Sequence, residues 1–351
     1  MTDLKELYKK VKKTIETIPL SSLYPGFRLH KFALYNSEMI IINDLIIPYN
    51  EAFMGNTSIF YEGEYIAIWN IEMDPVSDID ILSSNLIHEM FHCFQSEEKE
   101  KRFPDDLEIL MYPDSNNNYN IKFYENSLLI KAAKAKTIKE KTDLLTEFYE
   151  ARKYRESIIK EAIKNETKTE TVEGLAEYIG TISLKFLSTK KYEERIENYL
   201  SKLSDTKLIF DIRRISYFVG VIYLILLSEL NIDFVSYKLS EKETIYDLAK
   251  GNVALIPFQS KNENLLNEYN LMINERQKKI NEMKKEKKTI LKSPLSIYGY
   301  DPMNMYRVED EIFCSHFIFL SDGELNSFIK GPILLSMVKG SKNMVESYYT
   351  I

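Results

Sequence analysis

Hydrophobic residues in the first hundred positions change their spacing from a helical to a strand pattern. Residues 3–18 repeat apolar side chains at helical spacing opposite a lysine-rich face, which predicts an amphipathic helix. Short apolar runs with turn residues between them predict strands at 39–42, 45–47, 58–61 and 64–69. The last two flank a turn with glycine, as in a β-hairpin. We therefore expect an N-terminal antiparallel sheet.

Helical spacing then dominates most of the chain. The apolar stretch that follows Asp78 and Asp80 predicts a helix that either residue could cap and that ends near Glu98. A loop-rich stretch at 104–120 precedes further predicted helices at 122–136, 138–164, 167–187, 191–203, 206–230, 244–250 and 262–288. Strand-like runs return at 312–319 and 333–338.

These patterns predict an α+β fold that is mostly α. Residues 1–100 would form the N-terminal sheet and one long helix. Residues 101–292 would form a helical lobe, and residues 293–351 a small C-terminal β-rich segment.

Composition narrows the class of protein. The 351 residues carry a net charge of −7, so the chain lacks the positive field that nucleic acid or an anionic membrane attracts. Two cysteines cannot make a disulfide framework, and the first residues lack the apolar core of a signal peptide. The longest apolar run, 215–228, is shorter than the roughly 20 residues that span a bilayer, and it predicts a buried helix. We expect a soluble, cytoplasmic protein whose lysines near 278–288 are solvated.

The segment His88-Glu89-Met90-Phe91-His92 carries the strongest chemical signal. It is an HExxH motif in a helical stretch, and it holds two of the four histidines in the chain. Residues four apart share a helix face, so both imidazoles can bind one ion, while Glu89 can reach a water beside it. The alternative is two core histidines next to a surface glutamate.

A catalytic zinc site needs a third protein ligand and one open position. The best candidate is Glu173, on a helical face with small residues at Gly174, Ala176 and Gly180. Glycine destabilises helices, so its presence indicates close approach to another helix, here the motif helix. Glu170 and Glu177 remain rival ligands.

Together, HExxH and the segment Glu-Gly-Leu-Ala-Glu-Tyr that starts at Glu173 resemble the gluzincin metallopeptidases, the zincin clan of thermolysin and the large aminopeptidases. The resemblance implies a zincin-like core in which Glu173 binds zinc and Glu177 orients His88. Glu177 replaces the aspartate usual in thermolysin-like enzymes. The spacer between His92 and Glu173 is far longer than in the large aminopeptidases.

A second similar segment begins the long apolar run. Tyr217 and Gly220 there resemble the tyrosine helix of gluzincin aminopeptidases, which implies that Tyr217 donates a hydrogen bond to the oxyanion. Val219 replaces the lysine of that motif, and a core tyrosine is the alternative. His316, on a β pattern, is the competing donor, although we expect it to be a hydrogen-bonded core histidine.

Residues 49–57 lie where gluzincins place the edge strand beside the cleft. By this resemblance Ala52, Met54, Gly55 and Asn56 would border an extended substrate. The glutamate that grips a free amine in the aminopeptidases has no clear counterpart, which argues against that activity.

We therefore expect a zinc-dependent peptidase with one Zn²⁺ per chain and a peptide or protein as substrate. His88, His92 and Glu173 would hold the ion, with Glu89 as the general base. Cys93, rotated away on its helix, would be a small buried hydrophobic residue. The alternatives are a peptidase-like binding or regulatory module without turnover, and a zinc hydrolase of a non-peptide amide.

Overall fold

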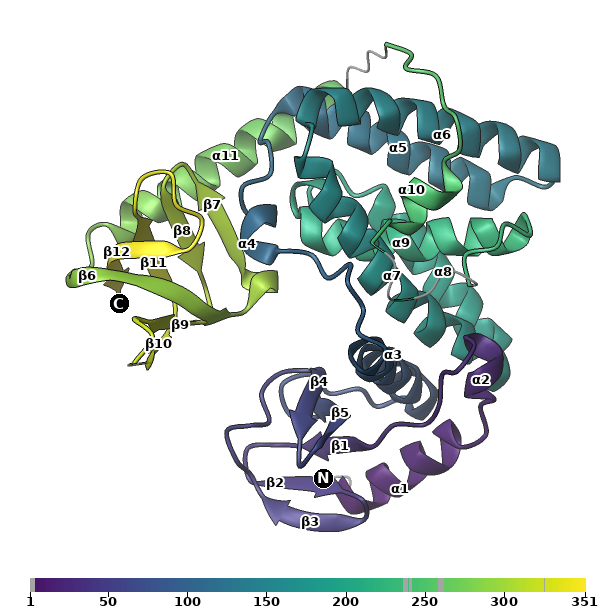
Figure 1. Ribbon diagram of the computed structural model, residues 1–351, viewed down its shortest axis with the longest axis horizontal. Coiled ribbons are helices and arrows are strands. Elements are labelled where there is room, and N and C mark those ends of the chain that lie inside the picture. Colours follow the sequence, from purple (N-terminus) through teal and green to yellow (C-terminus); the bar gives the residue numbers. More distant parts are fainter. Residues whose placement is uncertain (1–3, 236–238, 240–241, 258–261, 325) are drawn as a thin grey trace.

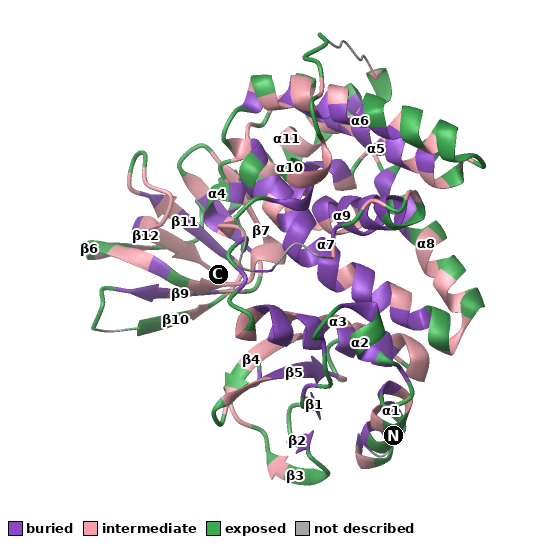
Figure 2. Ribbon diagram, turned by 45° about the vertical axis from the view of Figure 1, so that its right-hand side comes forward, coloured by how far each residue is buried: buried purple, intermediate pink, exposed green. Residues whose placement is uncertain are grey.

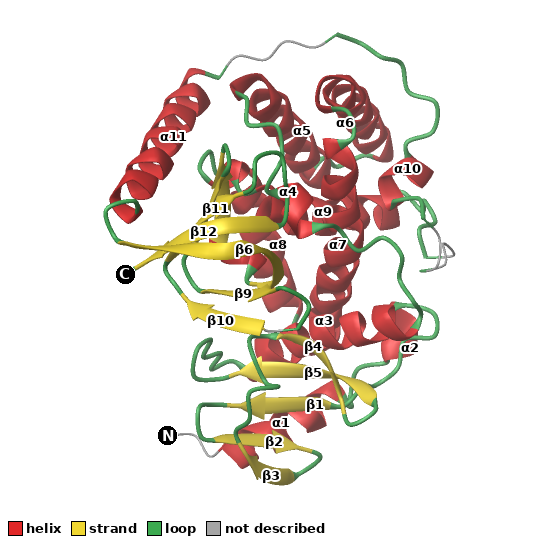
Figure 3. Ribbon diagram, turned by 60° about the vertical axis from the view of Figure 1, so that its left-hand side comes forward, coloured by secondary structure: helices red, strands yellow, loops and turns green. Residues whose placement is uncertain are grey.

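The computed structural model describes residues 4–235, 239, 242–257, 262–324 and 326–351 (Figure 1). It confirms the predicted α+β class. A five-stranded sheet lies in the N-terminal part, helices fill the middle of the chain, and a seven-stranded sheet follows in the C-terminal part (Figure 3). None of the described helices is long and apolar enough to cross a membrane.

The N-terminal sheet is mixed, so the prediction of a wholly antiparallel sheet was wrong. Its strands lie in the order β3-β2-β1-β5-β4, and β1 and β5 run parallel. All four residues of β1 are buried, so they lack the alternation that reveals a half-exposed antiparallel strand. The strands are β1 (Phe32–Tyr35), β2 (Met39–Ile42), β3 (Leu45–Pro48), β4 (Thr57–Tyr61) and β5 (Glu64–Asn70).

Both faces of this sheet are covered. On one face Phe32 and Leu34 join the large core that includes α1 (Leu4–Ile15) and α3 (Ile79–Glu97). On the other face Ala33 and Tyr35 pack with Phe53, from the loop between β3 and β4. The sheet is therefore a rigid support for α3, the helix that carries the HExxH motif.

Helix α3 begins at one of its two predicted caps. Oδ1 of Asp78 accepts hydrogen bonds from the backbone N–H groups of Asp80 (2.9 Å) and Ile81 (3.1 Å). Asp80 lies in the first turn instead, where a negative charge suits the helix dipole. The helix ends at Glu97, as the sequence predicted to within one residue.

Helix α7 occupies the centre of the helical region. It packs against α3 on one side and α9 on the other, and Figure 2 shows that both α7 and α9 are buried over most of their length. The predicted buried helix at 215–228 is thus confirmed. The helices of this region are α4 (Asp106–Ile109), α5 (Asn116–Lys134), α6 (Ile138–Ile159), α7 (Ala162–Leu187), α8 (Thr189–Leu203), α9 (Ile212–Glu229), α10 (Ile245–Ala249) and α11 (Glu263–Met283), with the short α2 (Leu20–Leu23) before the sheet and the 3₁₀ turn η1 (Leu208–Phe210) before α9.

The C-terminal sheet starts earlier than predicted. Helix α11 ends at Met283, and the lysines at 287 and 288 begin a long strand that pairs with the last strand. Pairing with a distant strand therefore overrides the local helical pattern. The strands, in the order β10-β9-β6-β12-β11-β8-β7, are β6 (Lys287–Tyr300), β7 (Met305–Val308), β8 (Glu311–Cys314), β9 (Phe317–Ser321), β10 (Asn326–Lys330), β11 (Ile333–Met337) and β12 (Met344–Thr350), with the turn η2 (Pro302–Asn304) between β6 and β7.

Candidate metal centre

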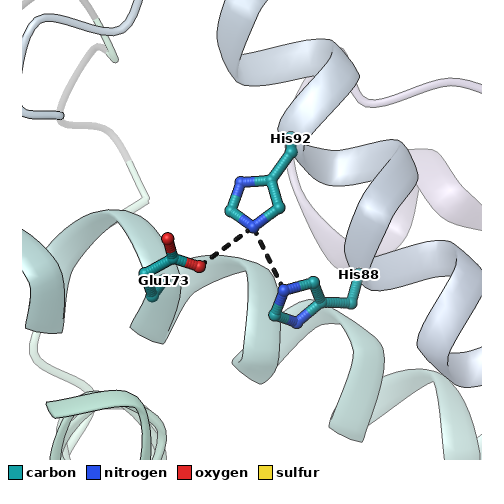
Figure 4. Close-up of side chains that lie close together, drawn as sticks. All are labelled: His88, His92 and Glu173. Carbon is teal, nitrogen blue, oxygen red and sulfur yellow. Dashed lines mark hydrogen bonds and ion pairs between the residues drawn. The ribbon is translucent and has the colours of Figure 1, made fainter. Parts of the chain in front are cut away.

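The two histidines of the motif point from α3 toward α7 (Figure 4). Nε2 of His88 and Nε2 of His92 lie 3.1 Å apart. Oε2 of Glu173, on α7, lies 3.1 Å from Nε2 of His92. Taking one ligand atom from each residue, all lie within 4.8 Å of one another. The structure thus brings together the three residues predicted to bind a metal.

Glycines let α7 approach both of its neighbours. A Cβ on Gly180 would lie 2.9 Å from the carbonyl oxygen of Ser84 and 3.2 Å from Cβ of His88, so a small residue is needed against the motif helix, as predicted. Gly174 was predicted to serve the same contact but faces α9. A Cβ there would lie 2.7 Å from Cα of Gly220. The Gly180 contact sets the spacing between Glu173 and the histidines, and the Gly174 contact sets the spacing between α7 and α9.

The outer nitrogen of each histidine is held by an acceptor. Nδ1 of His92 lies 2.7 Å from Oε1 of Gln95, whose Nε2 donates to the carbonyl of Val172 (3.0 Å) and so fixes the orientation of the amide. Nδ1 of His88 lies at ion-pair distance, 2.8 Å, from Oε2 of Glu177, although the two atoms are not aligned for a hydrogen bond. The Gln95 acceptor and the Glu177 carboxylate both favour a proton on Nδ1, which leaves a lone pair on each Nε2 in the neutral rings.

Two lone pairs and a carboxylate oxygen therefore meet at one point with no protein hydrogen between them. Such a group needs a cation, or a proton in its absence. Burial alone would lower the pKa of His92, but the Glu173 carboxylate outweighs burial and raises the pKa to about 9. Burial would raise the pKa of Glu173, yet His92 and Arg213 lower it. The donor set of two imidazoles and one carboxylate fits a catalytic zinc ion.

Glu89 lies beside these ligands and is 8% exposed. Burial raises the pKa of its carboxyl, against the opposing effect of His88 and His92. Within the part of the chain that the structure describes, no side chain or backbone N–H donates a hydrogen bond to this carboxylate. A buried carboxylate with free acceptor positions is suited to take a proton from water.

Tyr217 lies at the site, as the resemblance implied. Its ring is parallel to that of His88, with centroids 6.4 Å apart. Burial and the Glu173 carboxylate hold the pKa of its hydroxyl well above the usual value, so the group is a neutral donor. Nη2 of Arg213, one turn earlier on α9, lies 3.3 Å from the Tyr217 oxygen and 3.2 Å from Oε1 of Glu173.

The rival ligands lie elsewhere. Glu170 points away from the histidines and pairs with Arg152, Nη2 to Oε1 2.9 Å, in a fully buried group of charges. Glu177 accepts a hydrogen bond from Tyr199 while it contacts His88. Burial would raise the pKa of Glu177, but His88 and Arg195 lower it to about 2. Glu177 thus stands where it can orient His88.

His316 is hydrogen-bonded, as predicted, but the prediction that it lies in the core was wrong. Its side chain is 48% exposed, in the turn between β8 and β9, and Nδ1 lies 2.6 Å from Oδ2 of Asp301. The apolar run that suggested one continuous strand breaks at Ser315 and His316, because the chain reverses there to pair β9 with β6 and β10. Cys93 is fully buried in the core, as predicted.

The predicted substrate strand at 49–57 was also misplaced. Ala52, Met54, Gly55 and Asn56 belong to the loop before β4. Oδ1 of Asn56 accepts from the backbone N–H of Asn70 (2.8 Å), and Gly55 adopts a φ of 75°, which favours a turn. The edge of the sheet is β4 itself, which packs against α3.

Sequence reasoning missed the residues that support the ligands. Gln95 follows His92 by three positions on the same helix face, a signal that could have been used. Arg213 and Tyr199 reach the site from α9 and α8, and no local pattern indicates such contacts. Compared with known proteins, the chain matches no family, no curated protein and no solved structure.

Proposed function

We propose that this protein is a zinc-dependent peptidase. The observation that carries the proposal is the convergence of three acceptor atoms from His88, His92 and Glu173, beside Glu89, whose carboxylate has no donor among the described residues. This set matches catalytic zinc sites that keep one position for water or substrate. An HExxH helix combined with a glutamate from a second helix supports a gluzincin-like, zincin-type core.

A bound zinc ion would supply a Lewis acid that polarises a carbonyl and eases the deprotonation of water. Glu89 then accepts the proton from the attacking water. Because burial raises its pKa, Glu89 binds that proton more firmly than an exposed glutamate would, and it can hand the proton on to the leaving amine. Glu89 therefore serves first as base and then as acid.

Tyr217 supplies a donor for the oxygen on which negative charge develops. Its hydroxyl stays protonated at neutral pH, and its ring is held against His88. A donor already in place before the reaction stabilises a transition state without reorganisation. Arg213 holds both Glu173 and Tyr217, so it positions a ligand and a donor together.

An extended peptide could bind along the edge strand. β4 lies at the edge of the sheet and packs against α3, so one side of its backbone is free to pair with another strand. Peptides that add to a sheet edge are held mainly by backbone hydrogen bonds. This mode suits a peptide bond better than a small amide, and it favours a peptide substrate.

The test is the pair Glu89→Gln, on α3, and Glu98→Gln, at the residue that caps the C-terminus of α3. Glu98 is exposed at the end of α3, so its change is the matched control. Wild-type protein should cleave members of a quenched peptide library, and a chelator should stop cleavage. Glu89→Gln should keep its zinc and lose activity by roughly 10²–10⁴-fold, the usual contribution of a positioned base.

Two results would contradict the proposal. One is purified protein that binds no zinc after loading. The other is Glu89→Gln protein that cleaves at the wild-type rate, which would assign cleavage to a contaminant and leave a binding or regulatory module. Cleavage of amides but of no peptide would favour a non-peptide amidase.

A further inference from the structure

A cavity of about 330 Å³ lies on the other side of Arg213 from the metal centre. The start of α9 and the middle of α11 form part of its wall, and the C-terminal segment supplies the rest through Tyr300 and Tyr306. Figure 1 shows this segment beside α4 and α11. The volume is within the range of pockets that hold small molecules or peptide side chains.

Arg276, on α11, lines this cavity without an acceptor. Its guanidinium lies over the ring of Tyr306, 5.1 Å from the centroid, and it is half-buried. Among the described residues, none accepts a hydrogen bond from Arg276 or places a carboxylate at ion-pair distance. A guanidinium held against an aromatic ring keeps its planar set of donors available for a ligand.

Arg213 borders the same cavity and also contacts Glu173 of the metal centre. Its two outer nitrogens are occupied by Glu173, Tyr217 and Asp106, but its Nε is buried and has no hydrogen-bond partner in the described structure. Arg213 therefore forms a wall of the cavity, and Arg276 is the lining arginine whose donors are available to a ligand.

The other charged groups of the cavity are already engaged. Arg307 donates to the carbonyl groups of Glu309 and Ser341 and pairs with Asp310. Asp211 caps α9. Asp114 is the remaining charged residue of the cavity. Burial raises the pKa of its carboxyl, and the charge of Arg276 lowers it. The cavity thus offers more free donors than free acceptors, with aromatic walls from Tyr119 and Phe210.

We propose that this cavity binds a carboxylate of the peptide substrate, with Arg276 as the anchor. The inference rests on the proposed peptidase function for the identity of the ligand as a peptide. Arg213 lines the cavity and also contacts Glu173, so the cavity and the metal centre share this residue and a peptide bound at one lies near the other. The carboxylate comes either from an acidic side chain or from the C-terminus.

This assigns a role to the C-terminal segment. Without Tyr300, Tyr306 and the turn at 302–304, the donors of Arg276 would face open solvent, where an ion pair is weak. The β segment therefore encloses a site that the helical region only half builds.

Binding to the Glu89→Gln full-length protein tests the proposal without turnover. Three fluorescein-labelled pentapeptides are compared by anisotropy: a neutral one with a C-terminal amide, the same peptide with a free C-terminus, and the amide with one glutamine replaced by glutamate. At least one carboxylate peptide should bind about tenfold or more tightly than the neutral one, as expected for a charge-assisted hydrogen bond. The peptide that gains affinity identifies the source of the carboxylate.

Arg276→Gln should remove this preference, while Lys278→Gln, the same charge change at an exposed position of α11, should keep it. Arg276→Lys should restore part of it, which excludes misfolding as the cause. The proposal is overturned if no carboxylate peptide is preferred, or if Arg276→Gln and Lys278→Gln bind alike. Failure of the proposed function is separate: it appears as absent zinc-dependent cleavage by wild-type protein while the Arg276-dependent preference persists.

Discussion

Two groups of buried ionisable side chains lie along α7, and they differ in their balance of charge. The first, which we call the balanced cluster, contains Lys122, Glu125, Arg152, Arg155, Glu166 and Glu170. Every carboxylate in it contacts a cation, for example Glu166 Oε1 and Arg155 Nη2 at 2.7 Å. Its three cations match its three carboxylates, and all six side chains are almost completely buried.

The metal centre begins one turn later on the same helix and is not balanced. Four carboxylates, from Glu89, Glu173, Glu177 and Asp106, lie near two guanidinium groups among the residues that the structure describes, those of Arg195 and Arg213. With neutral imidazoles this leaves an excess of two negative charges. The difference teaches that burial of ionisable groups alone does not mark a functional site. The metal centre is distinguished by its missing positive charge, and the two missing charges equal the charge of a divalent ion.

Replacing one glutamate in each group by alanine should give the largest effects and so tests this contrast most strongly. Glu170→Ala leaves Arg152 buried without its partner, so the free energy of unfolding should fall by about 3–5 kcal/mol. Glu173→Ala should lower zinc affinity by more than the roughly 10–100-fold expected for residues that only orient a ligand. It should also destabilise the metal-free protein, because His92 and Arg213 lose their carboxylate partner.

Urea denaturation in chelator and competitive zinc titration measure the two effects. If Glu170→Ala removes the metal while Glu173→Ala keeps it, the contrast between the groups is reversed and Glu173 is not the ligand.

Removal of the Tyr217 hydroxyl should have the next largest effect. Tyr217→Phe keeps the ring against His88, so kcat should fall by about 10²–10³-fold with little change in KM, because an oxyanion contact forms mainly in the transition state. Tyr223→Phe is the control on the same helix, since the Tyr223 hydroxyl is buried in the core, where it hydrogen-bonds with that of Tyr149. Equal kcat values for the two variants would exclude the donor role.

The groups that hold the outer histidine nitrogens should matter less. Gln95→Leu removes the acceptor for Nδ1 of His92, and Glu177→Ala removes that for His88. Each should weaken zinc binding by roughly 10–100-fold while leaving about one zinc per chain at saturation. Unchanged affinity in both variants would show that the rings are held by packing alone.

The smallest expected effect is the release of a proton when zinc binds. Because the pKa of His92 is raised to about 9, the metal-free site binds a proton that zinc must displace. Calorimetric titration at neutral pH in buffers of different ionisation enthalpy should show about one proton released per zinc. Zinc binding with no proton release would mean that His92 is neutral before the metal arrives.

The raised pKa of His92 also determines whether the stability of the metal-free protein rises or falls with pH. A folded-state pKa above the unfolded value of 6.5 gives stability that is complete below pH 6.5 and is lost as the pH rises through about 9. Denaturation of the metal-free protein across this range should show the decline, and His92→Gln should reduce it.

The sequence revealed the parts of the site that lie on one helix. The spacing of His88 and His92, the cap at Asp78 and the small residue at Gly180 are local signals, and each leads to the observed geometry. Arg213 was not predictable, because its contacts with Glu173 and Asp106 join elements far apart in the chain.

Contacts between distant parts of the chain also decide the features of the site and of the fold that the sequence left open or predicted wrongly. Glu170 and Glu173 are both buried on one helix, and only the positions of Arg152 and His92 decide which carboxylate faces the metal centre. The parallel pairing of β1 with β5 and the exposed turn at His316 likewise depend on distant partners. Local periodicity carries no information about these partners.

The contact between Gly180 and the carbonyl oxygen of Ser84 has a consequence for redesign. The spacing of α7 and α3 is set where a backbone oxygen meets a residue without a side chain, so the opening offered to an ion depends on the main chain. Replacement of a ligand, such as Glu173→His or Glu173→Cys, would shift the preference between hard and soft metals. The range of ionic radii accepted would stay the same. Metal identity and metal size can therefore be tuned independently in this scaffold, the first by side chains and the second by the contact at Gly180.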